Sequence, residues 1–183
     1  MNIKSLSAAL IMLAAFTIMA ACGKRDRQAG DFTAAELAMI HESDSIMRVL
    51  TIDAPSDLAV LRSLSYDLSD SALLSDDFKR LAELMVATVT HPSQDGVGIA
   101  GPQVGLNRRV VAVQRFDKEG EPFEVYPNVR IVWASDSLAA GPEGCLSVPD
   151  RRGEVLRSQE IVIEYADITG VEHSLQQNPL ESN

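Results

Sequence analysis

The sequence predicts an α+β fold in which short antiparallel strands accompany one long helix near the start of the domain. Apolar residues recur at helical spacing between Asp76 and His91, which predicts a helix with one buried face. Elsewhere, short runs of branched apolar residues alternate with turn-forming Gly, Pro, Asn and Asp, a pattern typical of strands joined by tight turns. The length of 183 residues suits one domain and a leader.

The composition argues against two classes of protein. A formal net charge of −10 disfavours a nucleic-acid partner, because the phosphate backbone would be repelled. Only two cysteines occur, so the chain is not a disulfide-stabilised scaffold.

The first residues have the features of an export signal. Lys4 precedes the apolar run Leu6–Ala21, which is shorter than the roughly 20 residues that a membrane span needs. The run ends in Met19-Ala20-Ala21-Cys22, which resembles the lipobox of bacterial lipoproteins, in which the cysteine is lipidated and becomes the first residue. We therefore expect an exported lipoprotein anchored to a bacterial membrane through Cys22, on its periplasmic or outer-surface side. The alternative is an ordinary cleaved signal in which Cys22 is incidental.

These features divide the chain into three parts. We expect a signal peptide over residues 1–21, a lipidated cysteine and polar tether over 22–45, and a folded domain over 46–183. A short helix is predicted within the tether at Ala34–Ile40.

Within the domain, the elements follow from local patterns. Ile46–Ile52 predicts a strand and Leu58–Leu64 a helical turn. The long helix starts at Ser75 or Asp76 and ends at His91, because the following proline disfavours helix at the residue before it. Further strands are predicted at residues 109–114, 129–134, 153–156 and 160–165, and another begins near residue 171.

Three glycines after the long helix spell G-x-G-x-x-G, the pattern of a dinucleotide-binding turn. They are Gly96, Gly98 and Gly101. That interpretation needs a strand before the pattern and a helix after it, whereas here a helix precedes and a strand follows. The glycines instead allow the backbone of a bound substrate to approach closely.

The stretch Glu143–Pro149 holds Cys145, the only cysteine outside the leader, among residues that favour a tight turn. A thiol presented on a turn beside backbone N–H groups can be a metal ligand or a nucleophile. The alternative is a buried cysteine that acts as a small hydrophobic residue.

Together, the two stretches resemble the first two motifs of the peptide deformylases. The family's first motif is G-φ-G-φ-A-A-P-Q, and residues 96–103 depart from it only at Gly101, where Ala is usual. The second motif is E-G-C-L-S, which residues 143–147 match at every position. The flanking sequence also agrees, from about residue 46 to about residue 170.

The resemblance implies an activity and a set of roles. The family removes the formyl group from N-terminal formyl-methionine of peptides, using Fe²⁺ or Zn²⁺ held by one Cys and two His. By resemblance, Cys145 is the thiolate ligand, and Gln103 and the backbone N–H of Leu146 form the oxyanion hole. Gly98 pairs with the substrate backbone. Arg152 matches a basic residue near the substrate, and is equally well explained as a solvated charge.

The family's third motif, H-E-x-x-H, is absent from this sequence. The three histidines are His41, His91 and His173, and none lies in such a pattern. In the family this motif lies on a central helix around which the other elements wrap. We therefore expect a peptide-deformylase-like fold that lacks the central metal-binding helix, does not bind metal stably, exposes apolar surface and has marginal stability.

Three hypotheses follow from the intact and missing motifs. The first is a deformylase-family metallohydrolase whose coding sequence is cut short, for instance by a frameshift, and which is inactive as written. The second is an exported lipoprotein that still binds N-terminal Met or formyl-Met peptides without catalysis. The third is a structural lipoprotein whose motifs are relics.

Overall fold

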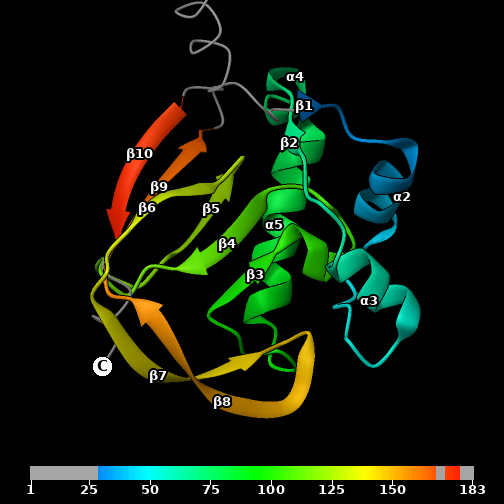
Figure 1. Ribbon diagram of the computed structural model, residues 1–183. Coiled ribbons are helices and arrows are strands. Elements are labelled where there is room, and N and C mark those ends of the chain that lie inside the picture. Colours follow the sequence, from blue (N-terminus) through cyan, green and yellow to red (C-terminus); the bar gives the residue numbers. More distant parts are fainter. Residues whose placement is uncertain (1–28, 168–171, 178–183) are drawn as a thin grey trace, which may run out of the picture.

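The computed structural model describes residues 29–167 and 172–177 and confirms the predicted α+β class. The long helix α5 (Asp76–Thr90) runs through the middle of the fold, with a three-stranded antiparallel sheet beside it (Figure 1). That sheet has the order β3-β4-β5 (Gly98–Ala100, Val110–Gln114, Phe123–Pro127). A second antiparallel sheet has the order β10-β9-β6 (Glu172–Gln177, Ile161–Ala166, Arg130–Ala134).

The long hairpin of β7 (Leu138–Cys145) and β8 (Val148–Ser158) extends below both sheets in Figure 1. The predicted strand at 153–156 is therefore part of a longer one, and β7 was not predicted. The strands predicted near 109–114, 129–134 and 160–165 are present as β4, β6 and β9. A short parallel pair, β1 (Ala29–Gly30) with β2 (Asp67–Leu68), joins the start of the described chain to the domain.

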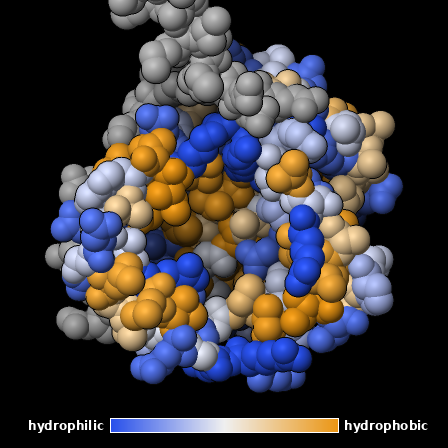
Figure 2. Space-filling view, in the orientation of Figure 1, coloured by the Kyte–Doolittle hydropathy of each residue, from blue (hydrophilic) through white to orange (hydrophobic). Residues whose placement is uncertain are grey.

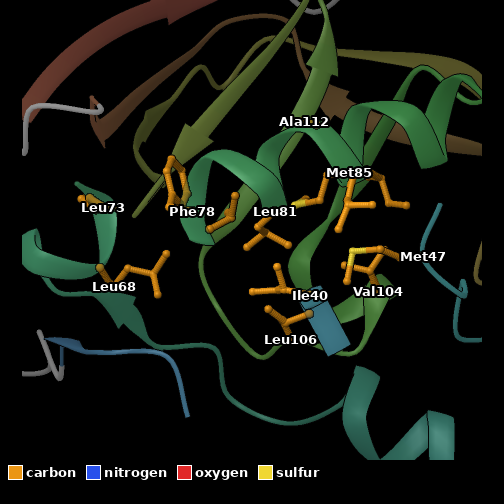
Figure 3. Packing of buried hydrophobic residues seen from close by; sticks show 14 of the residues in the cluster. Ile40, Met47, Leu68, Leu73, Phe78, Leu81, Met85, Val104, Leu106 and Ala112 are labelled. Carbon is orange, nitrogen blue, oxygen red and sulfur yellow. The ribbon is translucent and has the colours of Figure 1, made fainter. Parts of the chain in front are cut away.

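The predicted long helix is confirmed at both ends. The hydroxyl of Ser75 accepts a hydrogen bond from the backbone N–H of Phe78, which caps the N-terminus. The helix ends before His91, as expected from the proline that follows it. Figure 3 shows Phe78, Leu81 and Met85 pointing from α5 into a shared apolar core, and all three are buried.

Residues 29–42, which we call the N-terminal arm, are folded onto the domain, in contrast to the expected tether. Their helix α2 (Ala34–Glu42) is longer than predicted and begins with a capping box between Thr33 and Glu36. Ile40 is fully buried and lies with Leu81 and Leu106 in the core (Figure 3). Sequence periodicity missed this packing because α2 has a single buried apolar residue.

The predicted strand at Ile46–Ile52 is wrong, because this segment forms no ladder with another strand. Its backbone N–H groups are satisfied elsewhere. Met47 N donates to the Thr88 hydroxyl at 2.8 Å, Leu50 N to the Gln103 carbonyl at 2.8 Å, and Ile52 N to the Ser147 carbonyl at 2.9 Å. Met47 and Leu50 of this segment are buried, and Met47 belongs to the core cluster with α5. The predicted helical turn nearby is α3 (Pro55–Leu61).

Two shorter elements complete the fold. Helix α4 (Asp70–Leu73) precedes α5, and the 3₁₀ turn η1 (Gly101–Val104) follows β3. Because a single 3₁₀ turn follows the glycines, they do not open a dinucleotide-binding helix. Within the ranges described, the helices are all too short or too polar to cross a membrane.

One face of the molecule is hollowed at its centre, and apolar residues line part of the hollow (Figure 2). Large apolar side chains are also exposed on the outer strands. Ile131, Val132 and Trp133 of β6 are 64%, 47% and 50% exposed, and Leu138 and Leu156 of the hairpin are 54% and 65% exposed. The predicted exposed apolar surface is therefore confirmed for these strands.

Candidate functional site

The two sequence motifs meet at one cavity of about 1050 Å³ between β3, η1 and the β7–β8 hairpin. Its lining includes each candidate named from the sequence except Cys22, which lies outside the described residues. These are Gly98, Gln103, Cys145, Leu146 and Arg152. The fold thus joins residues that lie more than forty positions apart in the chain.

The side-chain amide of Gln103 is oriented by its neighbours. Its Oε1 accepts a hydrogen bond from the backbone N–H of Ala100 at 2.9 Å, so the Nε2 end must point the other way. Nε2 lies 3.3 Å from the Ser147 hydroxyl and 3.8 Å from the Cys145 sulfur. A side-chain N–H donor is therefore held beside the thiol.

Cys145 is exposed, which rules out the interpretation as a buried structural cysteine. It ends β7, where the hairpin register shifts between Gly144 and Cys145. The ladder closes at the Cys145–Val148 pair, and Leu146 and Ser147 form the two-residue turn between them. Because Leu146 lies outside the ladder pairs, its backbone N–H is not used in strand pairing.

Packing holds this turn against the rest of the domain. A Cβ at Gly96 would lie 3.0 Å from Cδ1 of Leu146 and 3.0 Å from Cγ2 of Val89, so the leucine side chain is seated against the glycine and α5. The backbone carbonyl of Ser147 accepts the bond from Ile52. Sequence reasoning did not single out Ser147 as the partner of Gln103, although it belongs to the E-G-C-L-S motif.

Gly98 lies on an edge strand. In the order β3-β4-β5, β3 pairs with β4 on one side, and Gly98 is opposite Val113. The other edge of β3 faces the cavity, to which Gly96, Val97 and Gly98 contribute. An edge strand with unpaired N–H and C=O groups can accept an extended peptide as an additional strand.

Arg152 is opposite Gly144 in the hairpin, and its Cγ lies 3.8 Å from where a Cβ of that glycine would be. The missing side chain at Gly144 leaves room for the arginine side chain on β7, and both Arg152 and Cys145 line the cavity. Arg151 also lines the cavity, and neither arginine forms an ion pair with a described residue. Asp95 and Asp150 line the same cavity, so its rim carries both signs of charge.

Glu143 of the second motif does not line the cavity and pairs instead with an arginine of the hairpin. Its carboxylate accepts two hydrogen bonds from Arg157 across the hairpin, at 2.7 and 2.8 Å. These bonds from Arg157 hold the pKa of the Glu143 carboxyl below its usual range. Glu143 therefore braces the hairpin rather than acting as a base in the cavity.

The residues present do not fit an iron or zinc site. Among the side chains that the structure describes, no group of three His, Cys, Asp or Glu could hold a metal ion. His41 pairs with Asp77 at 2.6 Å on the exposed side of α2 and α5, and His91 bonds to Ser93. His173 belongs to β10, and its side chain lies outside the description. Among the described residues Cys145 would thus supply a single ligand, whereas a catalytic metal usually has three from the protein.

Comparison with known proteins finds one family. The family model described as polypeptide deformylase matches residues 46–183. A peptide deformylase of Leptospira biflexa is 35% identical over 137 residues, which cover 70% of this chain and 73% of that protein. Peptide deformylase 2 of Gloeobacter violaceus is 39% identical over 113 residues, covering 61% of this chain and 57% of that protein.

Solved structures show the same similarity. A class I type b peptide deformylase from Acinetobacter baumannii, bound to Met-Ala-Ser, superposes with a TM-score of 0.64 at 29% identity, covering 74% of this chain and 85% of the other. The peptide deformylase from Thermotoga maritima gives a TM-score of 0.62 at 26% identity, covering 74% and 83%.

Proposed function

The chain belongs to the polypeptide deformylase family of hydrolases, and from that premise we propose that its cavity binds the N-terminal methionine end of peptides, formylated or free. One observation carries the proposal: the Gln103 amide nitrogen, with its orientation fixed by Ala100, lies 3.8 Å from the Cys145 sulfur in a cavity open to solvent. The A. baumannii relative solved with Met-Ala-Ser supports the choice of peptide.

We propose that an extended peptide adds to the free edge of β3, with its backbone next to Gly98. Its terminal formyl or carbonyl oxygen would then lie near Gln103 Nε2 and the backbone N–H of Leu146. Two such donors suit an oxygen that gains negative charge, and in enzymes each is typically worth about 3 kcal/mol of barrier. Arg152, opposite Gly144 in the hairpin, would contact the peptide beyond its first residue.

We further propose that the chain as written does not hold Fe²⁺ or Zn²⁺ stoichiometrically and does not hydrolyse formyl-peptides. The family is metal-dependent, but this sequence contains no H-E-x-x-H, so two imidazole ligands and the glutamate between them are missing. Cys145 alone cannot retain an ion against water. The substrate-binding part of the site is therefore better supported than its catalytic part.

Calorimetry with Met-Ala-Ser and formyl-Met-Ala-Ser tests the binding proposal. Gln103→Leu should weaken binding of the formyl peptide, because the oriented N–H donor is lost. Gln114→Leu, at the half-buried end of β4 and outside the cavity lining, is the matched control and should bind like the parent chain. An absence of heat with both peptides would refute the binding proposal and leave the motifs as relics.

A graft tests the catalytic part. A helical segment containing Q-H-E-x-D-H, taken from a peptide deformylase relative and joined after Gly170, should give a protein that holds one metal ion and hydrolyses formyl-Met peptides. Cys145→Ser in the grafted protein should lose both properties. Turnover at an ordinary enzyme rate by the ungrafted chain would show that this assignment of ligands is wrong.

A second candidate is an exported peptide-binding lipoprotein without catalysis. It is favoured by the Met19–Cys22 lipobox pattern together with the incomplete ligand set. Cys22 would carry acyl chains, and more than one chain gives stable membrane anchoring. Mass spectrometry of the mature protein should find a lipidated Cys22 as its first residue. An unmodified N-terminus at another residue would refute the anchor.

A further inference from the structure

The N-terminal arm precedes the residues matched by the family model, yet a buried arginine fixes it to the domain. Arg108 and Glu36 are only 7% and 9% exposed. Arg108 Nε and Nη2 donate to the two carboxylate oxygens of Glu36 at 2.7 and 2.8 Å. Burial disfavours the charged carboxylate, but the bonds from Arg108 and Thr33 outweigh it and hold the pKa of Glu36 below its usual range.

The other N–H groups of Arg108 bind main-chain carbonyls. Nη1 donates to Gly30 at 3.1 Å and to Asp67 at 3.2 Å, and Nη2 donates to Asp31 at 2.6 Å. A guanidinium has five N–H donors, and here all five are used. Since Gly30, Asp31 and Glu36 belong to the arm, charge-assisted bonds hold the arm at several points.

The main chain of Arg108 packs against the turn that carries Gln103. Arg108 N donates to the Leu106 carbonyl at 2.7 Å, and Leu106 N donates to the Gly101 carbonyl at 2.9 Å. A Cβ at Gly101 would lie only 2.6 Å from the Arg108 carbonyl oxygen and 2.8 Å from that of Leu106. The chain segments are therefore in direct contact at Gly101, where an alanine side chain would meet both carbonyl oxygens.

Gly101 begins η1, and Gln103 lies two residues later in the same turn. The contacts form a continuous path from Glu36 to the Arg108 side chain, from the Arg108 backbone to Gly101, and from Gly101 to the Gln103 amide. We propose that the N-terminal arm is a positioning element for the site, with Glu36 and Arg108 as positioning residues that fix the turn presenting Gln103. This inference rests on the role proposed for Gln103 in peptide binding.

The test compares Glu36→Gln with Asp117→Asn in the full-length chain. Both variants remove a carboxylate from a buried arginine, since Arg115, which is 5% exposed, pairs with Asp117 at 2.5 Å. Only Glu36 belongs to the path toward Gln103. NMR follows the side-chain amide signals of Gln103, and calorimetry measures the affinity for Met-Ala-Ser at a temperature well below unfolding.

We expect Glu36→Gln to shift the Gln103 amide signals and to weaken Met-Ala-Ser binding by about fivefold to tenfold, a usual size for coupling between sites. Hydrogen exchange of the Ala100 and Leu106 amides, which bond to Gln103 and Gly101, should accelerate more than that of Ile163. Asp117→Asn should change neither the signals nor the affinity.

A purely structural arm predicts a different result. Glu36→Gln would then lower the melting temperature but leave the Gln103 signals and the affinity as in Asp117→Asn, and the proposal would be overturned. If Glu36→Gln does not fold, Thr33→Ala replaces it, because it leaves the Glu36 carboxylate and Arg108 in place. It removes the two bonds of the Thr33 hydroxyl, which donates to the Glu36 carboxylate at 3.0 Å and accepts from the Glu36 backbone N–H at 3.3 Å. If the parent chain binds no peptide, the binding proposal fails, while the Gln103 signals still decide whether the arm positions the turn.

Discussion

The two halves of the molecule differ in how well their side chains are buried. The half built on α2 and α5, which we call the closed half, packs around a buried core, whereas the half built on β6, β7 and β8, the open half, leaves its side chains partly or fully exposed. α5 buries Phe78, Leu81 and Met85 almost completely, and α2 adds Ile40. By contrast, no residue of β6, β7 or β8 is buried. The two halves meet at the cavity, so one wall of the candidate site is anchored in a packed core and the other is a hairpin held mainly by its own ladder.

This difference indicates where the stability of the chain resides. Most of the buried apolar cluster comes from residues 40–112, and β9 adds Ala166. The apolar side chains of the open half, such as Trp133 and Leu156, gain little from folding because they stay half or more exposed. An additional packed element on that side would bury these side chains.

The largest expected difference in stability is between the same substitution, Leu→Ala, made once in each half. Leu81→Ala removes a fully buried side chain and should lower the free energy of unfolding by about 2–5 kcal/mol. Leu156→Ala removes the same atoms from a side chain that is 65% exposed and should change it by less than about 0.5 kcal/mol. Urea unfolding followed by circular dichroism measures both. Equal losses would show that the two halves do not differ in packing.

Gly101→Ala should have the next largest effect. We expect it to lower the free energy of unfolding by about 1–3 kcal/mol, because the added Cβ would collide with the backbone carbonyls of Leu106 and Arg108. The same substitution at Gly153, where a Cβ would meet nothing within 4 Å, is the control in the open hairpin. Thermal unfolding of the two variants gives the comparison. A stable Gly101→Ala chain would mean that the turn has room for the alanine usual in its relatives.

Acid should destabilise the closed half by protonating Glu36, which pairs with Arg108. The folded pKa of Glu36 lies below that of an unfolded glutamate, about 4.3, so its stabilising contribution is complete above that pH and is lost as the pH falls through the folded pKa. Hydrogen exchange at Ile40 between pH 6 and pH 3 should show progressive opening of α2. The Glu36→Gln variant should be less stable than the parent chain at pH 6, and its stability should fall less than that of the parent chain on acidification. An identical acid response in both chains would exclude Glu36 as the cause.

The smallest effect is expected in the open hairpin. Glu143 and Arg157 are 39% and 61% exposed in their side chains, and exposed ion pairs contribute at most about 1 kcal/mol. Glu143→Gln should therefore barely shift the urea midpoint, and 0.5 M salt should remove much of the difference from the parent chain. A loss as large as that of Leu81→Ala would show that the hairpin is a stability centre.

The sequence was most informative where local chemistry decides the structure. The Ser75 cap and the His91-Pro92 pair mark both ends of α5. The turn expected around Cys145 is present as Leu146 and Ser147, although the Gly and Pro residues that suggested it lie in the flanking strands β7 and β8. Ile46–Ile52 misled because its composition suits a strand, while its backbone N–H groups bond to side-chain oxygens and to carbonyls of turns rather than to a neighbouring strand. No local pattern reveals partners that lie this far along the chain.

The candidate site was predictable as a set of residues but not as a geometry. Two motifs named Gln103 and Cys145, whereas the orientation of the Gln103 amide depends on Ala100 and Ser147 and is visible only in the fold. The contact between Arg108 and Glu36 spans 72 positions, and neither residue belongs to the two motifs that named the site. Long-range ion pairs of this kind carry no periodic signal that sequence analysis could detect.

Docking of the N-terminal arm also sets a length. Since Gly30 and Asp31 are bound to Arg108, the chain between Cys22 and the folded domain is limited to residues 23–28. A fully extended chain spans at most about 3.5 Å per residue, so residues 23–28 form a linker that spans at most about 20 Å. With Cys22 in a lipid surface, as proposed, the cavity would lie no farther from the bilayer than this linker length plus one domain diameter, so it would meet peptides released near that surface.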